Sequence, residues 1–484
     1  MPFPFIGPTY QTQSTSVGVE RLVNLMTEVT ESPGEAQRIT YYGTPGIKTL
    51  TTLADSPGRG LFFQDGRCFA VTGGTLYELT IASDASSVTV TTRGTVANDG
   101  QPVTMCSSGI NGHQLFIVSG GSGYILDLNT HVLTTLTTNF PPNALMGAYL
   151  DGYFIALWED HFQISALMDG LSWNATDTAR PSITSDRLNS IVVNHRELWI
   201  FGELSTEVWY DAGTSPFPFA PVPGVLIEMG CRAPWSVTRF DNGLAWLGRN
   251  SAGGRIIVFA QQYQPQRLST HAVEAALHSY DQVDDFRGYA YREQGHTFYV
   301  LNSAHNNATW AYDAAVPKPY GWAERGFWNS TLGQYEAQKQ IEHAYVARGL
   351  HVMLAYDSGK VYQQRLGIYT DDGVPIRAMR RCPHVQPDNR RVFYSRFELG
   401  IEPGVGLAQG QGADPQLMLR WSDDGGYTWS AEQWVTAGRM GTYDTRARWL
   451  RLGSSRNRVF EVTQSDNVKR AWIWASVQAQ PEAA

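Results

Sequence analysis

The sequence predicts an all-β fold, a β-propeller of six or seven blades followed by a C-terminal region that resembles a β-sandwich. Three observations predict it: short strands recur between tight turns, the composition is rich in glycine and aromatic residues, and long segments of helical periodicity are absent. The 484 residues include 47 Gly, 15 Trp, 23 Tyr and 20 Phe. Glycine builds turns and aromatic residues favour strands, so we expect little helix.

The repeated unit is clearest in residues 61–79. Three short apolar runs are separated by Asp65-Gly66 and Gly73-Gly74, dipeptides that supply the positive φ angles of tight hairpin turns. In the middle run, residues 68–71, both faces are apolar. Such a strand is covered on both sides, which predicts a meander packed between neighbouring sheets.

Further copies of this unit recur at a regular distance along the chain. Steps between corresponding turn residues are 46, 40, 43, 48, 52 and 54 residues, close to the roughly 40 to 50 residues of one propeller blade. Unrelated hairpins in a sandwich or barrel are the alternative. The turn residues used for this spacing are Gly66, Gly112, Gly152, His195, Gly243, Gly295 and Gly349.

Three regions follow from these patterns. Residues 1–54 form an N-terminal extended leader without the hairpin pattern, and such a segment either donates a strand that closes a propeller ring or reaches a neighbouring subunit. Residues 55–374 form the propeller. Residues 375–484 form a C-terminal β-rich domain, either a compact sandwich or the closing blade, with a glycine-rich linker at residues 404–412.

Charge separates the chain into two parts. The formal net charge is -8, but residues 1–374 carry 22 basic and 34 acidic side chains, whereas residues 375–484 carry 15 and 11. We therefore expect the two parts to meet different partners or different faces of one partner. The four cysteines are far apart in sequence and no apolar run reaches 18 residues, which predicts reduced thiols, no standard secretion and no stable membrane insertion.

The most specific local motif lies in the C-terminal region. Ser422, Asp424, Gly426, Thr428 and Trp429 match the Asp-box turn, which is found in sialidases and other glycan-active propellers. By this resemblance Asp424 accepts backbone N–H groups, Gly426 takes a positive φ and Trp429 packs below the turn. The turn is structural and lies away from catalytic centres.

We expect no catalysis, no cofactor and no metal site. A retaining sialidase needs an arginine cluster and a Tyr nucleophile paired with Glu, and no spacing in the sequence singles out such residues. The 11 His are scattered, with neither a His-Glu-x-x-His motif nor a Cys/His cluster, which argues against zinc.

Two stretches are candidate interfaces. Phe217 and Phe219 alternate with prolines in residues 216–223, which favours an extended strip with exposed rings; a stiff linker packed on its own propeller is the alternative. Arg446, Arg448 and Arg451 lie at or near strand spacing beside a Trp. They form either an interface stripe or a solvated strand face.

Several stretches of the chain resemble one protein family. They look like the packaged-DNA stabilisation proteins of short-tailed bacteriophages (podoviruses), which are also described as tail hub or nozzle proteins. Each stretch is moderately specific alone, but together they span most of the chain. The matching stretches are residues 21–25, 42–48, 228–231, 241–248, 268–274, 448–453 and 456–461.

The resemblance implies a structural virion protein. Six copies would form a ring beneath the head-to-tail adaptor and portal, retain the packaged DNA, and form the channel through which double-stranded genomic DNA is ejected. The ring would carry a tail tip or needle and tailspikes or tail fibres. It implies location in the virion tail, with the host cytoplasm as the place of assembly. The alternative function is a sialidase-like or other glycan-binding or glycan-cleaving propeller.

Overall fold

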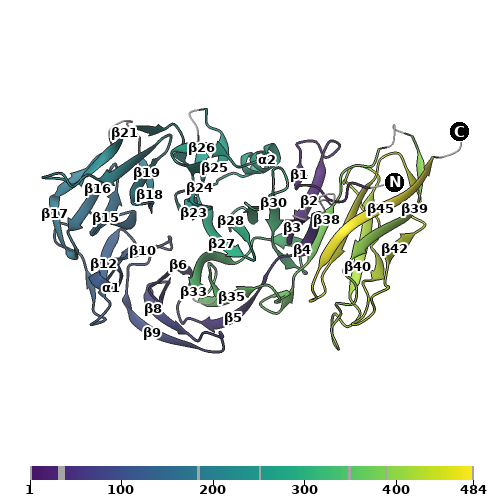
Figure 1. The fold of residues 1–484 in the computed structure, drawn as a ribbon, viewed down its shortest axis with the longest axis horizontal. Coiled ribbons are helices and arrows are strands. Elements are labelled where there is room, and N and C mark those ends of the chain that lie inside the picture. Colours follow the sequence, from purple (N-terminus) through teal and green to yellow (C-terminus); the bar gives the residue numbers. More distant parts are fainter. Residues whose placement is uncertain are drawn as a thin grey trace.

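A disc of radiating β-sheets lies beside a two-sheet sandwich in the computed structural model of the chain, and the two labelled termini lie on the sandwich (Figure 1). The structure describes residues 3–30, 39–181, 186–249, 252–346, 350–386 and 390–481. The predicted fold class, a β-propeller with a C-terminal β-sandwich, is confirmed.

In the part of the chain that the structure describes, the propeller has seven blades, each built on an antiparallel meander. Blades 1 to 4 comprise β6 (Gly58–Gln64), β7 (Arg67–Thr72), β8 (Thr75–Ile81) and β9 (Val88–Thr95); β10 (Thr104–Ser107), β11 (Gln114–Ser119), β12 (Ser122–Asp127) and β13 (Leu133–Thr135); β14 (Met146–Leu150), β15 (Tyr153–Trp158), β16 (His161–Ala166) and β17 (Asp169–Ala179); and β18 (Leu188–Asn194), β19 (Glu197–Gly202), β20 (Thr206–Asp211) and β21 (Phe219–Ile227). Blades 5 to 7 comprise β22 (Gly230–Cys231), β23 (Thr238–Phe240), β24 (Gly243–Arg249), β25 (Arg255–Gln261) and β26 (Gln264–Arg267); β27 (Arg287–Glu293), β28 (His296–Ser303), β29 (Ala308–Asp313) and β30 (Trp322–Arg325); and β33 (Gln340–Val346), β34 (Leu350–Ala355) and β35 (Lys360–Arg365) with β5 (Gly46–Thr52).

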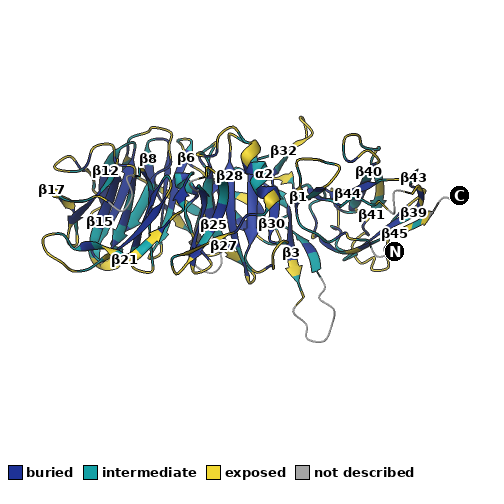
Figure 2. Ribbon diagram, turned by 90° about the horizontal axis from the view of Figure 1, so that it is seen from above, coloured by how far each residue is buried: buried dark blue, intermediate teal, exposed yellow. Residues whose placement is uncertain are grey.

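The turn residues and the apolar runs explain the blades. Asp65 and Gly66 have φ angles of 53° and 80°, as the turn between β6 and β7 requires. Residues 68–71 of β7 are buried on both faces, because neighbouring blades cover each sheet from either side. Figure 2 shows the same burial along the middle strands of the disc.

The N-terminal region closes the ring. β5 pairs antiparallel with β35, joining Gly46 to Arg365 at one end and Thr52 to Lys360 at the other. Blade 7 therefore combines three strands from the end of the propeller with one strand from before its start. Of the two uses expected for the leader, the structure shows the closing strand.

The sandwich is joined to the propeller by a continuous sheet. β2 pairs with β30 of blade 6 on one side and with β38 on the other, so one sheet runs from the propeller into the sandwich. The sandwich strands are β3 (Leu25–Val29), β4 (Ile39–Gly43), β39 (Val392–Ile401), β42 (Ala447–Leu450), β43 (Ser454–Ser455) and β45 (Ala471–Pro481), facing β1 (Tyr10–Gln11), β2 (Val19–Val23), β38 (Ala378–Arg381), β40 (Gln416–Ser422), β41 (Gln433–Thr436) and β44 (Val459–Gln464).

None of the helices in the described part of the chain is long and apolar enough to cross a membrane. The four cysteines are free thiols.

The remaining elements are short. They are α1 (Gly109–Gly112), α2 (His271–Ser279), the 3-10 turn η1 (Pro234–Ser236), β31 (Phe327–Asn329), β32 (Gln334–Glu336), β36 (Thr370–Asp371) and β37 (Val374–Pro375).

The start of the chain is anchored in the sandwich core. Phe5 is 1% exposed and packs with Tyr41 and Trp472. The fully buried Arg380 donates from Nε to the carbonyl of Phe5 at 2.8 Å and from Nη1 to the carbonyl of Pro8 at 3.0 Å. A buried guanidinium needs such acceptors, so Arg380 fixes the path of residues 5–8 through the sandwich.

Candidate functional sites on the propeller and the sandwich

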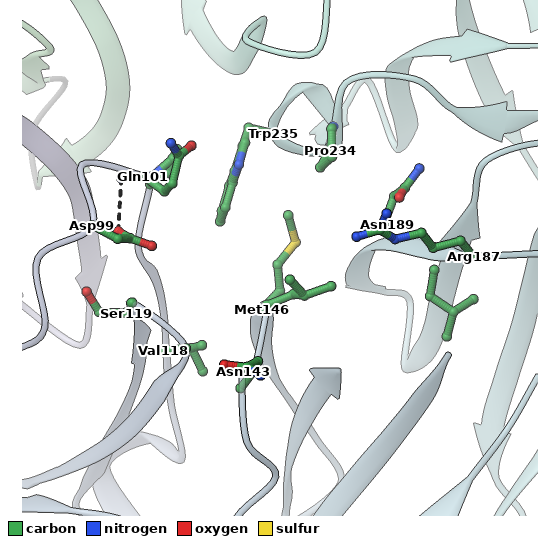
Figure 3. Close-up of a pocket in the computed structure, with 16 residues that line it drawn as sticks. Asp99, Gln101, Val118, Ser119, Asn143, Met146, Arg187, Asn189, Pro234 and Trp235 are labelled. Carbon is green, nitrogen blue, oxygen red and sulfur yellow. Dashed lines mark hydrogen bonds between the residues drawn. The ribbon is translucent and has the colours of Figure 1, made fainter. Parts of the chain in front are cut away.

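A cavity of about 510 Å³ opens at one end of the propeller axis. It lies where the inner strands of blades 2 to 4 begin. Figure 3 shows Trp235 and Met146 beside the same space, with Asp99 on one side and Arg187 on the other. The lining is mixed, with polar side chains such as Asp99, Gln101 and Asn189 beside apolar ones such as Met146, Leu188 and Trp235.

The charged side chain of Asp99 at this cavity takes part in an ion pair that holds a loop in place. Asp99 pairs with the buried Arg59 at 2.5 Å, and Arg59 also donates to the carbonyls of Gln101, Gly73 and Ala97 at 2.6 to 2.8 Å. Burial lowers the pKa of the Arg59 guanidinium. The pair therefore fastens the connection from blade 1 to blade 2.

Metal-ligating side chains do not gather in the part of the chain that the structure describes, where no three His, Cys, Asp or Glu residues lie close enough to hold a metal ion. The cavity of about 510 Å³ is in the range of small-molecule sites.

The Asp-box residues form a hydrogen-bonded turn after β40. The Asp424 carboxylate accepts the backbone N–H groups of Tyr427 and Thr428 at 3.0 and 2.9 Å, and the hydroxyls of Ser422 and Thr428 at 2.6 Å each. These hydrogen bonds, the one from Ser422 first, hold the pKa of Asp424 well below its usual range. Gly426 has φ 100°.

Trp429 connects this turn to a row of charged side chains. The guanidinium groups of Arg381 and Arg420 lie 4.8 and 4.7 Å from the centroid of its ring. Both arginines pair with Glu461, at 2.8 and 2.5 Å, and the Glu461 side chain is 1% exposed. The Asp-box therefore covers a buried carboxylate held by two cations.

The charged row crosses five neighbouring strands. Strand register aligns Arg21, Arg381, Glu461 and Arg420 on β2, β38, β44 and β40. Arg21 in turn pairs with Glu324 of β30 at 2.5 Å. We call these five residues the charged row. Because it begins on blade 6 and ends in the sandwich, it ties the two domains together.

The expectation of exposed rings in residues 216–223 is wrong for Phe219, which is 4% exposed. Phe217 and Phe219 pack at 5.8 and 6.3 Å from the ring of Phe162 in the blade 3 and 4 core. Burying aromatic area is more favourable than presenting it to water. The segment lies on its own propeller, and an interface role for these rings stays a prediction.

The three arginines at β42 are placed differently from one another. Arg446 is exposed just before the strand, and Arg448 is half-buried within it and pairs with Glu398 at 3.1 Å. Arg451 is exposed after the strand, where its φ of 61° turns the backbone. Arg446 and Arg448 share a face with the exposed Leu450 by strand alternation, and their interface role remains a prediction.

Sequence reasoning missed the charged row and a groove between blades 4 and 5, described below. The row depends on the register of β2, β38, β44 and β40, which lie far apart in the sequence.

These features define a scaffold class: a seven-bladed propeller joined to a β-sandwich by a continuous sheet and by a row of ion pairs across it. Residues 2–343 match the family model described as the β-propeller of bacteriophage P22 Gp10, and residues 378–480 match the model described as its β-sandwich. The chain belongs to the bacteriophage P22 Gp10 family, phage tail structural proteins that stabilise packaged DNA. Membership fits a structural, non-enzymatic protein of the virion tail.

Other comparisons add little. No curated protein sequence matches the chain significantly. Among solved structures, the N-terminal domain of Nup159 is similar, with 14% identity, a TM-score of 0.41, and coverage of 72% of this chain and 99% of that one. A chain of the mitotic checkpoint complex is similar with 12% identity and a TM-score of 0.40, and the match covers 66% of this chain and 93% of that one. Neither similarity is close enough to carry an argument.

Proposed function

We propose that this protein is the tail hub or nozzle of a short-tailed phage. Six copies form a ring beneath the head-to-tail adaptor and portal, retain the packaged genome, and form the channel for DNA ejection. The ring carries the tail tip or needle and the tailspikes or fibres. The observation that carries this proposal is the match of both domains to the Gp10 family.

The dimensions of the propeller support a channel between copies. The cavity at one end of the propeller axis has a volume of about 510 Å³, in the range of small-molecule sites. We therefore place the path of duplex DNA between copies rather than through one subunit. A ring of subunits encloses a lumen of larger width, which is what DNA retention and ejection need.

The distribution of charge supports head-to-tail association of neighbouring copies. It also supports a channel wall that does not bind DNA. Residues 1–374 carry 22 basic and 34 acidic side chains, and residues 375–484 carry 15 and 11. A heterologous contact that closes forms a ring, and opposite net charges favour such a contact. An acidic wall repels phosphate, so DNA slides past rather than binding.

The proposal predicts that particles assembled without this protein package DNA and then lose it. We would measure nuclease-protected DNA in particles from cells in which the gene is deleted, at successive times after packaging. The expected result is normal initial packaging followed by loss of nearly all protected DNA. Particles lacking only the tailspike are the control and should keep their DNA. Retention of DNA by the deletion particles contradicts the proposal.

The host cytoplasm is the expected place of assembly, since the four cysteines are free thiols and free thiols are typical of a reducing compartment. Fractionation of infected cells before lysis tests this, with unassembled protein expected in the cytoplasmic fraction.

A further inference from the structure

A groove with unusual side-chain chemistry lies between blades 4 and 5. Its deeper part has a volume of about 250 Å³ and is formed by three hairpin turns, β18–β19, β23–β24 and β25–β26. The described residues that line it supply four amides, one carboxylate, one imidazole and two aromatic rings, and none of them is aliphatic, lysine or arginine. Such a lining suits a small ligand that is mostly polar and has apolar patches of its own.

Two stacked rings form the aromatic part of the groove. Trp199 and Tyr263 lie 5.8 Å apart at an angle of 28°, and the Tyr263 hydroxyl donates to the Glu197 carboxylate. Trp199 is 2% exposed, and its indole N–H is buried with no hydrogen-bond partner among the described residues. A buried donor without an acceptor is costly, so the protein leaves a polar group unsatisfied beside the groove.

A hydrogen-bond chain orients the amides. Asn194 donates from Nδ2 to Nδ1 of His195 at 3.2 Å, and His195 Nε2 then donates to Oδ1 of Asn242 at 3.0 Å. This order fixes the neutral imidazole with its proton on Nε2. Both asparagines line the groove, and the Asn194 carbonyl oxygen and the Asn242 amino group are the acceptor and the donor that this chain of hydrogen bonds does not use. An acceptor and a donor on neighbouring residues suit the hydroxyl groups of a sugar.

The turns around the groove hold large residues in left-handed backbone. Tight hairpin turns of this kind favour Asn-Gly or Asp-Gly, and a bulky residue at positive φ costs on the order of 1 kcal/mol. Such strain clusters at binding sites, where the side chain is needed. The φ angles are 50° at His195, 62° at Arg196, 42° at Asp241, 61° at Asn242, 52° at Gln262 and 64° at Tyr263.

The groove continues toward the propeller axis. A second cavity of about 630 Å³ shares Asn194 and Asn242 with the first and is also lined by Arg239, Tyr291 and His343. Two adjoining cavities with shared amides accommodate a chain of repeating polar units rather than a single small molecule.

We propose that this groove binds a neutral oligosaccharide, as the accessible end of a surface glycan presents it. One unit packs on the Tyr263 ring with its hydroxyls paired to Asn194, Asn242 and Glu197, and further units extend into the second cavity. Glu197 and the absence of lysine or arginine among the described residues lining the deeper cavity disfavour an anionic sugar there. The inference is independent of the proposed tail function.

Variants with glycine at the strained positions test the proposal without threatening the fold. Glycine tolerates positive φ, so Asn242→Gly with Gln262→Gly should keep or raise the Tm while removing two ligand-facing amides. We would titrate the intact protein with maltohexaose, chitohexaose and mannohexaose by calorimetry and saturation-transfer NMR. At least one hexaose should bind, and the double variant should weaken it by about tenfold or more, ~1.4 kcal/mol.

Glu159→Gly is the matched control, because Glu159 has φ 48° in the blade 3 hairpin and lies outside the groove; its saccharide affinity should equal that of the unchanged protein. Monosaccharides should bind more weakly than the hexaoses. The proposal is overturned if no hexaose binds, if the double variant binds as well as the control, or if sialyllactose binds more tightly than lactose.

Discussion

Replacing Gly58 with alanine is expected to destabilise the propeller by about 3 kcal/mol or more. Gly58 starts β6 of blade 1, and a Cβ added there would lie 2.0 Å from the carbonyl oxygen of Ala355 at the end of β34 in blade 7. The Ala355 carbonyl oxygen belongs to the backbone and cannot move aside as the end of a flexible side chain can. The two blades would separate at the seam where the ring closes.

Chemical denaturation of Gly58→Ala, followed by fluorescence, measures this effect. Gly43→Ala is the matched control, since its added Cβ meets the side chain of Arg470 at an ordinary 3.6 Å, and we expect a change below ~1 kcal/mol. Equal stability of the two variants would contradict the packing at the closing seam.

Replacing Glu461 with alanine is the second large expected effect, a loss of about 3 kcal/mol. The Glu461 side chain is 1% exposed and separates Arg381 from Arg420. Without the Glu461 carboxylate, the guanidinium groups of Arg381 and Arg420 face each other. The charged row then holds three arginines and one carboxylate, that of Glu324. Removing one partner of a buried ion pair costs more than the pair contributes, because the remaining charges stay desolvated.

Glu402→Ala provides the comparison for Glu461→Ala. Glu402 pairs with Lys469 at 2.7 Å in the same domain, but both side chains are over 40% exposed, so the expected cost is ~0.5 kcal/mol. Glu461→Gln, which keeps the shape and one acceptor, should fall between the two. A cost for Glu461→Ala no greater than that for Glu402→Ala would show that the charged row does not stabilise the sandwich.

The propeller was predictable because its signals are local. Each blade places turn residues such as Asp65-Gly66 or Asp151-Gly152 at one hairpin, and apolar runs follow within a few residues. The sequence does not show that the seventh blade is completed by β5, because its partner β35 lies over 300 residues away. A long-range pairing of this kind leaves no periodic trace in the sequence.

Candidate sites were harder to predict for the same reason. Phe217 and Phe219 alternate with prolines as an exposed strip would, but both pack against Phe162 of the neighbouring blade, and Phe219 is buried there. The groove joins Asn194 and Asn242 from different blades, and the charged row joins strands from both ends of the chain. Single-strand patterns do not show which side chains meet across sheets.

The most direct test of the central claim is the mass of the assembled protein, measured by analytical ultracentrifugation and negative-stain imaging, alone and mixed with connector-bearing phage particles. Our account predicts a ring of six copies with an open lumen, formed either in solution or on the particles. A monomer that never joins the particles would contradict the tail-hub account.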